Sequence, residues 1–114
     1  MWICLNDAFI SAVQNRDNHD ELMVRARKKT HLANVFPNRK KEIFSVDESD
    51  YAWRIVVSKT DFTDMLSNRV NDISYDNFKN SVKDTALKKM YNEVWWLGLI
   101  MQEGRKWVKE HFGY

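Results

Sequence analysis

The segment VRARKKTHL, residues 24–32, holds four basic side chains within a few positions of one another. They are Arg25, Arg27, Lys28 and Lys29. Guanidinium and ammonium groups bind phosphate and carboxylate oxygens, so this cluster is a candidate contact for a nucleic acid or for an acidic protein surface. Arg25, Arg27 and Lys29 alternate along the chain, and their side chains share one face if a β-strand continues through all three.

Arg54 is a further candidate for the same surface. It lies in YAWRIVVS, residues 51–58, and points to the face opposite the apolar side chains of that segment. If the two strands are neighbours, one side of the sheet carries an arginine cluster suited to phosphate. Surfaces that bind nucleic acids usually combine basic and aromatic side chains, whereas Tyr51 and Trp53 are expected on the face opposite Arg54. This weakens the nucleic-acid hypothesis.

The charges of the middle of the chain are divided into two blocks. A basic block is followed at once by an acidic one, and the two can neutralise each other across neighbouring strands or form a dipolar surface that attracts a charged partner. In the first case the arginine heads pair with Glu21, Glu42 or Asp50 while their stems cover the sheet. The basic block is Arg25, Arg27, Lys28, Lys29, Arg39, Lys40 and Lys41, and the acidic block is Glu42, Asp47, Glu48 and Asp50.

The segment VWWLGLIM, residues 94–101, is a candidate surface for a protein partner. Neighbouring residues on a helix lie about 100° apart, so Trp95 and Trp96 are both buried only if the helix is covered over a wide arc. Either the tail folds back with Trp107 and Phe112, or an apolar patch that includes Ile100 remains for another chain. The candidates for partner binding are therefore Arg25, Arg27, Lys28, Lys29, Arg54, Trp95, Trp96 and Ile100.

Signatures of catalysis, of metal binding and of cofactor binding are not found in the sequence. The three glycines cannot form a phosphate-binding loop, and the single cysteine and the histidines are dispersed along the chain. We therefore predict no catalytic residue, no metal ligand and no cofactor. The acidic turn Asp47–Asp50 with Lys59 leaves a small metal-dependent nuclease as a low-ranked alternative, because clustered carboxylates can hold Mg²⁺.

The hydrophobic pattern changes from a period of two to a period of 3.6 near Ser58. Ser58 followed by Asp61 resembles a capping box, so a helix should start there, with Phe62, Met65, Leu66 and Val70 along its apolar stripe. A second turn should follow Asp76, and a long helix should extend to Gly104. The segments expected to form strands are 1–5, 8–13, 22–27, 42–46 and 51–58, with a short helix from Thr30 to Phe36.

These elements predict an α+β fold. An antiparallel sheet of about five strands in residues 1–58 is followed by two to three helices in residues 59–103, packed mainly on one face. The alternative is an interleaved sandwich of the ferredoxin type, in which the short helix at 30–36 is a true crossover. We expect residues 1–114 to form a single domain, with 104–114 as a tail that either packs or frays. The first two strands, apolar on both faces, are expected to be covered or central.

The cellular setting is also indicated by the sequence. The lone Cys4 cannot form an intrachain disulfide and is expected to be a buried hydrophobe in a reducing compartment. The start of the chain has no signal-peptide pattern, and the longest apolar run is too short to span a bilayer, which takes about 20 residues. These features predict a cytoplasmic protein that does not interact with membranes.

Several of these segments resemble those of a family of small bacterial and phage-borne proteins that are uncharacterised. The resemblance extends to about residue 101 and includes MW, FISAV, VRAR, DYAWR, YDNFK and the late VW. It implies an accessory-gene setting, in which small inhibitors and adaptors that act against host defence, anti-CRISPR proteins among them, are common. The leading hypothesis is a non-enzymatic protein-binding module that binds another protein or itself. A nucleic-acid-binding domain that uses residues 25–29 is the alternative.

Overall fold

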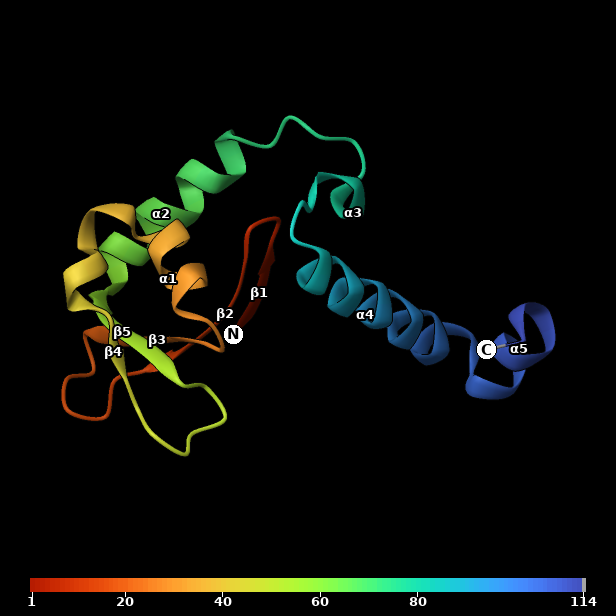
Figure 1. Ribbon diagram of the computed structural model, residues 1–114, viewed down its shortest axis with the longest axis horizontal. Helices are drawn as coiled ribbons and strands as arrows, with labels where there is room; N and C mark the ends of the chain where they lie inside the picture. Colours follow the sequence, from red (N-terminus) through yellow and green to blue (C-terminus); the bar gives the residue numbers. More distant parts are fainter. Residues whose placement is uncertain (114) are drawn as a thin grey trace. The chain divides into compact units, whose positions relative to one another are not determined.

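The structure is a computed structural model that describes residues 1–113. The fold is α+β, as the sequence predicts, with one five-stranded antiparallel sheet and several helices (Figure 1). The chain divides into two compact units, Met1–Asp76 and Asn77–Tyr114. The first unit contains the sheet and the second unit is helical, and each is described separately below. Among residues 1–113, no helix combines the length and the apolar character needed to cross a membrane.

The sheet has the strand order β1-β2-β3-β5-β4, with every neighbouring pair antiparallel. β2 lies inside the sheet and is largely buried, as expected, whereas β1 is an edge strand with partly exposed side chains, which corrects the expectation that it is covered or central. Cys4 on β1 is exposed for the same reason and is not the buried hydrophobe that we expected. The strands are β1 (Trp2–Leu5), β2 (Ala8–Gln14), β3 (Glu21–Ala26), β4 (Phe44–Ser45) and β5 (Trp53–Ser58).

Helices α1 (Lys29–Val35) and α2 (Lys59–Asn71) pack on the same face of the sheet. Both helices contribute side chains to one core, in which alternate strand residues such as Ile10, Val24 and Ile55 are fully buried. Leu32 from α1 and Phe62 from α2 complete it. This core determines which face of the sheet each side chain is on, because every strand residue next to a core residue in sequence must point to the opposite face.

The start of α2 is as predicted, because the side chain of Ser58 accepts a hydrogen bond from the backbone N–H of Asp61 at 3.0 Å. The predicted apolar stripe is buried only in its first part, at Phe62 and Met65. Val70 is 64% exposed, because α2 continues after its contacts with the sheet core have ended.

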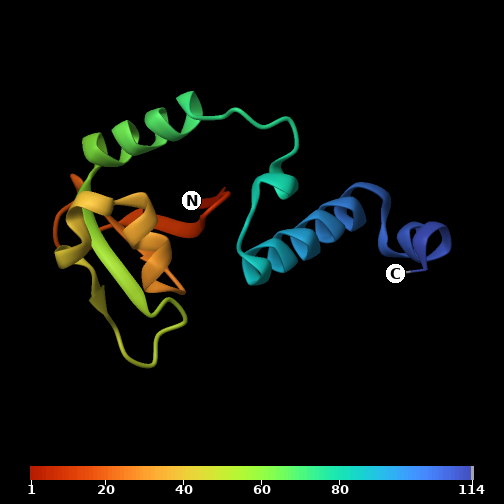
Figure 2. The ribbon, with the colours of Figure 1, turned by 45° about the horizontal axis from the view of Figure 1, so that its top comes forward.

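Residues 27–52 differ most from the prediction. The first short helix begins at Lys29 with Lys28 as its N-cap residue, not at Thr30. A 3₁₀-helix, η1 (Pro37–Glu42), follows it where the sequence analysis places no helix. β4 is reduced to two residues, and β5 begins only at Trp53, so the connection between them is a long loop that projects from the sheet (Figure 2).

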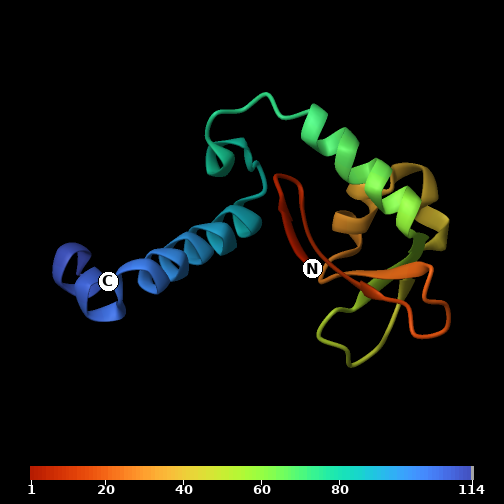
Figure 3. The ribbon, with the colours of Figure 1, turned by 180° about the vertical axis from the view of Figure 1, so that it is seen from behind.

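The second unit consists of α3 (Phe78–Ser81), α4 (Thr85–Glu103) and α5 (Arg105–Phe112). Asn77, not Asp76, caps α3 through its side chain. The long helix α4 ends at Gly104, as predicted, and Gly104 adopts a positive φ of 91° that disfavours other residues. Within residues 104–113 the predicted tail forms α5, which follows α4 after a sharp turn (Figure 3).

The apolar side chains of α4 are buried only near its start. Leu87 and Tyr91 are buried, whereas Val94, Leu97 and Met101 are 48%, 57% and 85% exposed. α5 contributes one buried side chain, Val108. A helical unit of this size has too few elements to enclose a long helix on all sides.

Candidate functional site

Arg25 on β3 and Arg54 on β5 are directly paired in the sheet. The two strands are therefore neighbours, which is the condition under which the sequence analysis expects one face of the sheet to carry an arginine cluster. Paired residues of antiparallel strands share a face, and the neighbours Val24 and Ile55 belong to the core on the helix side. We call the face opposite α1 and α2 the arginine face.

Arg25 and Arg54 are the centre of a row of paired residues that crosses all five strands. Trp2 pairs with Ser11, Ser11 with Arg25, and Arg54 with Phe44. The row on the arginine face is thus Trp2, Ser11, Arg25, Arg54 and Phe44, in the order β1-β2-β3-β5-β4. Ser11 is fully buried, whereas Trp2 and Phe44 on the edge strands are 73% and 40% exposed. Two aromatic rings therefore flank two guanidinium groups.

Tyr51 adds a third ring to this surface, which corrects the prediction that it lies on the face opposite Arg54. The Cζ atoms of Arg25 and Arg27 lie 4.7 and 4.6 Å from the centroid of the Tyr51 ring, within the range of cation–π contacts. Tyr51 is buried. The rule of alternating faces did not apply to it, because the strand begins two positions later, at Trp53.

The three arginines donate hydrogen bonds to hydroxyl and carbonyl groups. Arg25 donates to Ser11 Oγ at 2.9 Å, and Arg27 donates to the carbonyl oxygen of Asp50 at 2.8 Å. Arg54 donates to Ser49 Oγ at 2.7 Å and to the Tyr51 carbonyl oxygen at 3.4 Å. The bonds from Arg27 and Arg54 attach the loop between β4 and β5 to the sheet, whereas the bond from Arg25 joins β3 to β2.

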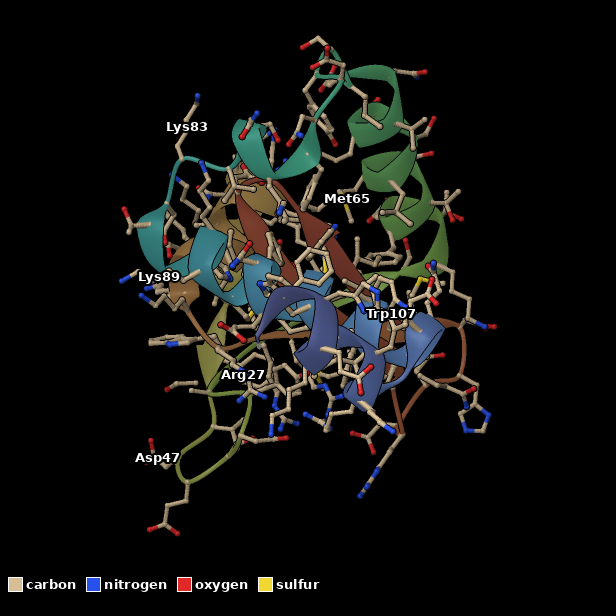
Figure 4. All side chains as sticks on the ribbon, turned by 90° about the vertical axis from the view of Figure 1, so that its right-hand side faces the viewer. Arg27, Asp47, Met65, Lys83, Lys89 and Trp107 are labelled. Carbon is tan, nitrogen blue, oxygen red and sulfur yellow. The ribbon has the colours of Figure 1, made fainter. Side chains whose placement is uncertain are left out.

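Within the part of the chain that the structure describes, no carboxylate forms an ion pair with Arg25, Arg27 or Arg54. The alternative in which Glu21, Glu42 or Asp50 neutralises these arginines is therefore wrong. Glu42 instead forms an ion pair with Arg39 at 2.7 Å. Asp50 accepts the hydrogen bond from Arg27 through its backbone carbonyl oxygen and not through its carboxylate. Asp47 extends outward from the loop between β4 and β5 (Figure 4).

Lys28 and Lys29 do not continue the arginine row. β3 ends at Ala26, and α1 begins at Lys29, so the predicted alternation stops before it reaches the lysines. The Lys29 Nζ lies 5.5 Å from the ring centroid of Trp53, which packs against the core on the helix side of the sheet. Lys28 is exposed.

The other group of predicted residues lies on α4 in the second unit. The rings of Trp95 and Trp96 pack edge-to-face, with their centroids 5.0 Å apart. The ring of Phe112 on α5 packs against Trp96 in the same way, with a centroid distance of 5.3 Å. The tail thus folds back over Trp96, which is half-buried like Ile100, whereas Trp95 stays 47% exposed. The tail therefore covers one part of α4, and apolar side chains remain exposed on another part.

Trp2, Ser11, Phe44 and Tyr51 were missed as members of the site. Each is a common apolar or small residue in a strand-like segment, and only the register of five strands brings them beside the arginines. Among residues 1–113, no group of three or more His, Cys, Asp and Glu side chains has the arrangement of a metal site. Comparisons of the chain with protein-family models, with curated proteins and with solved structures give no match.

Proposed function

We propose that the protein is a non-enzymatic binding protein that binds single-stranded nucleic acid on the arginine face of its first unit. The observation that carries this proposal is the row Trp2, Ser11, Arg25, Arg54 and Phe44. It combines guanidinium groups that form no ion pair with a carboxylate of residues 1–113 with exposed rings at both edges of the sheet.

The chemistry of a single strand fits this row. Its phosphates accept hydrogen bonds from guanidinium groups, and its unpaired bases can stack on aromatic rings, at about 1–3 kcal/mol per base. A duplex offers no free base faces for stacking. The preference for a single strand over a duplex therefore distinguishes this interface from a surface that is merely basic.

The test is a fluorescence anisotropy titration with a labelled single strand of about 16 nucleotides and its duplex, in DNA and RNA form, between about 50 and 200 mM salt. We expect the single strand to bind and its affinity to fall with salt, and we expect the duplex to bind more weakly. Trp2→Ala should weaken binding by about five-fold or more and lower the melting temperature little, because Trp2 is 73% exposed and meets Phe9 only in an edge-to-face contact.

Lys59→Gln is the matched control, because Lys59 is an exposed base at the start of α2, on the other side of the sheet. It should leave binding nearly unchanged. Absence of binding at the lowest salt concentration, or equal losses in Trp2→Ala and Lys59→Gln, would refute the proposal.

A second candidate function is the binding of another protein, or of a second copy, through α4. It is favoured by the exposure of Val94, Trp95, Leu97 and Met101 along one helix. Exposed apolar residues gathered in this way are typical of protein interfaces. In the accessory-gene setting implied by the sequence resemblance, such a protein would act as a stoichiometric inhibitor or adaptor of the anti-defence type.

Light scattering and a pull-down from host cells test this second function. Leu97→Ser should abolish any dimer or captured partner. Val70→Ser is the control, because Val70 is an equally exposed apolar residue on α2 of the first unit. If both variants retain the same partners as the unchanged protein, the α4 surface is not an interface.

A further inference from the structure

We propose that a cleft beside the arginine row is a subsite for one phosphate group, with room for the nucleoside that carries it. This inference rests on the proposed function, since it identifies where a phosphate of the bound strand lies. The cleft has a volume of about 340 Å³ and is formed by the end of β2, the turn after it, β3 and β5. Arg25 and Arg54 line it together with Arg16.

The charge of the cleft favours an anion. Three of its lining residues are arginines, and Asp17 is the one acidic residue among them. Asp17 forms no ion pair with them within the described chain, so the positive charge of the cleft is only partly offset. A phosphate between guanidinium groups would supply the missing counter-charge, with geometry suited to more than one N–H···O bond.

Arg25 has an unused donor at this position. Its Nε is buried and has no hydrogen-bond partner among residues 1–113, although its Nη2 donates to Ser11. A buried donor of a charged group without an acceptor costs free energy, and native proteins rarely contain one. A phosphate beside the guanidinium offers the acceptor that the described residues do not provide.

The apolar part of the lining indicates that the ligand is larger than a bare phosphate. Val13 and Met23, which are directly paired on β2 and β3, line the cleft next to the arginines. The volume lies near the lower end of the range for small-molecule sites, about 300–1,000 Å³. An ion alone would leave this apolar surface uncovered, whereas the base or sugar of a nucleotide would cover it.

The experiment follows the arginine Nε–H signals of the ¹⁵N-labelled protein by NMR while a nucleoside monophosphate, inorganic phosphate or an unphosphorylated nucleoside is added. We expect the monophosphate to shift the Arg25 signal and to bind more tightly than inorganic phosphate. The nucleoside without phosphate should produce no shift.

Two neighbouring variants with opposite effects make the test specific. Arg16→Gln should weaken monophosphate binding about two- to five-fold, and Asp17→Asn should strengthen it by a similar factor. Both residues are exposed, so the fold should be preserved. Asp64→Asn on α2 is the control and should leave the affinity unchanged.

The result that would overturn the subsite is an Arg25 signal that does not respond to the monophosphate. Equal binding of the nucleoside with and without phosphate, or an Asp17→Asn affinity equal to that of the unchanged protein, would also overturn it. A failure of the subsite can be distinguished from a failure of the proposed function. Trp2→Ala should weaken single-strand binding about five-fold or more while keeping monophosphate binding, and a protein that binds monophosphates but no strand would refute only the proposed function.

Discussion

Arg25 and Arg54 face each other across β3 and β5, and neither forms an ion pair within the described residues. Two like charges at directly paired positions destabilise a sheet unless something else offsets them. Here the repulsion between the two guanidinium groups is partly offset by their hydrogen bonds to neutral oxygens and by the cation–π contact with the Tyr51 ring. This leaves both guanidinium groups with charge available for a ligand anion.

We therefore predict that Arg25 and Arg54 contribute to the salt dependence of single-strand binding. Each phosphate contact adds about 0.7 to the slope of log affinity against log salt concentration, so Arg25→Gln with Arg54→Gln should reduce the slope by about 1.4. The measurement is a salt series of anisotropy titrations. An unchanged slope would mean that these arginines serve only to hold the loop between β4 and β5.

Tyr51 is predicted to support both stability and binding through its ring and not through its hydroxyl group. Tyr51→Phe keeps the ring under Arg25 and Arg27 and should alter the free energy of unfolding little. Tyr51→Leu removes two cation–π contacts and should cost about 2 kcal/mol. Urea denaturation measures both variants. Equal losses in the two would show that the hydroxyl group matters more than the ring.

The sequence predicted the fold well where a local rule decides the structure. The hydrogen bond of Ser58 to Asp61, the end of α4 at Gly104 and the strands in residues 2–26 each depend on residues close together in the chain. The failures were at the edges of the sheet and in residues 27–52. The position of β1 at an edge is a property of the whole sheet that local periodicity does not contain.

The candidate site was predicted in part for a similar reason. The alternation of Arg25 with its neighbours was enough to place it on the face opposite the core, and the pairing of β3 with β5, which the sequence left open, brings Arg54 beside it. The aromatic partners were not predictable, because Trp2 and Phe44 reach the same row only through the register of strands far apart in sequence. Lys29 would share the arginine face only if β3 continued to it, and α1 begins there instead.

Arg69 connects the two ends of the first unit, and we predict that lysine cannot replace it. Its guanidinium donates to both carboxylate oxygens of Asp7, at 2.7 and 3.3 Å, and to the Asn34 carbonyl oxygen at 2.9 Å. An ammonium group cannot reproduce this forked geometry, so Arg69→Lys should lower the free energy of unfolding by about 1–2 kcal/mol. Lys106→Gln, which removes the exposed pair with Glu110 at 3.9 Å, should change it little.

The ion pair between Arg39 and Glu42 predicts a dependence of stability on pH. The hydrogen bonds from Arg39 hold the pKa of the Glu42 carboxyl below its ordinary value of 4.5, and the partly buried guanidinium of Arg39 has a raised pKa for the same reason. A carboxyl whose pKa is lower in the folded chain than in the unfolded chain stabilises the fold at pH values above its ordinary pKa. The added stability is lost as the pH falls through the lower, folded pKa.

The unchanged protein should therefore melt at a higher temperature than Glu42→Gln at neutral pH, and the difference should shrink between about pH 5 and pH 3. Arg39→Gln provides the matched background, in which Glu42→Gln should have almost no effect at any pH, because its partner is absent. A difference in melting temperature that stays constant down to the lowest pH would show that Glu42 acts through packing and not through its charge.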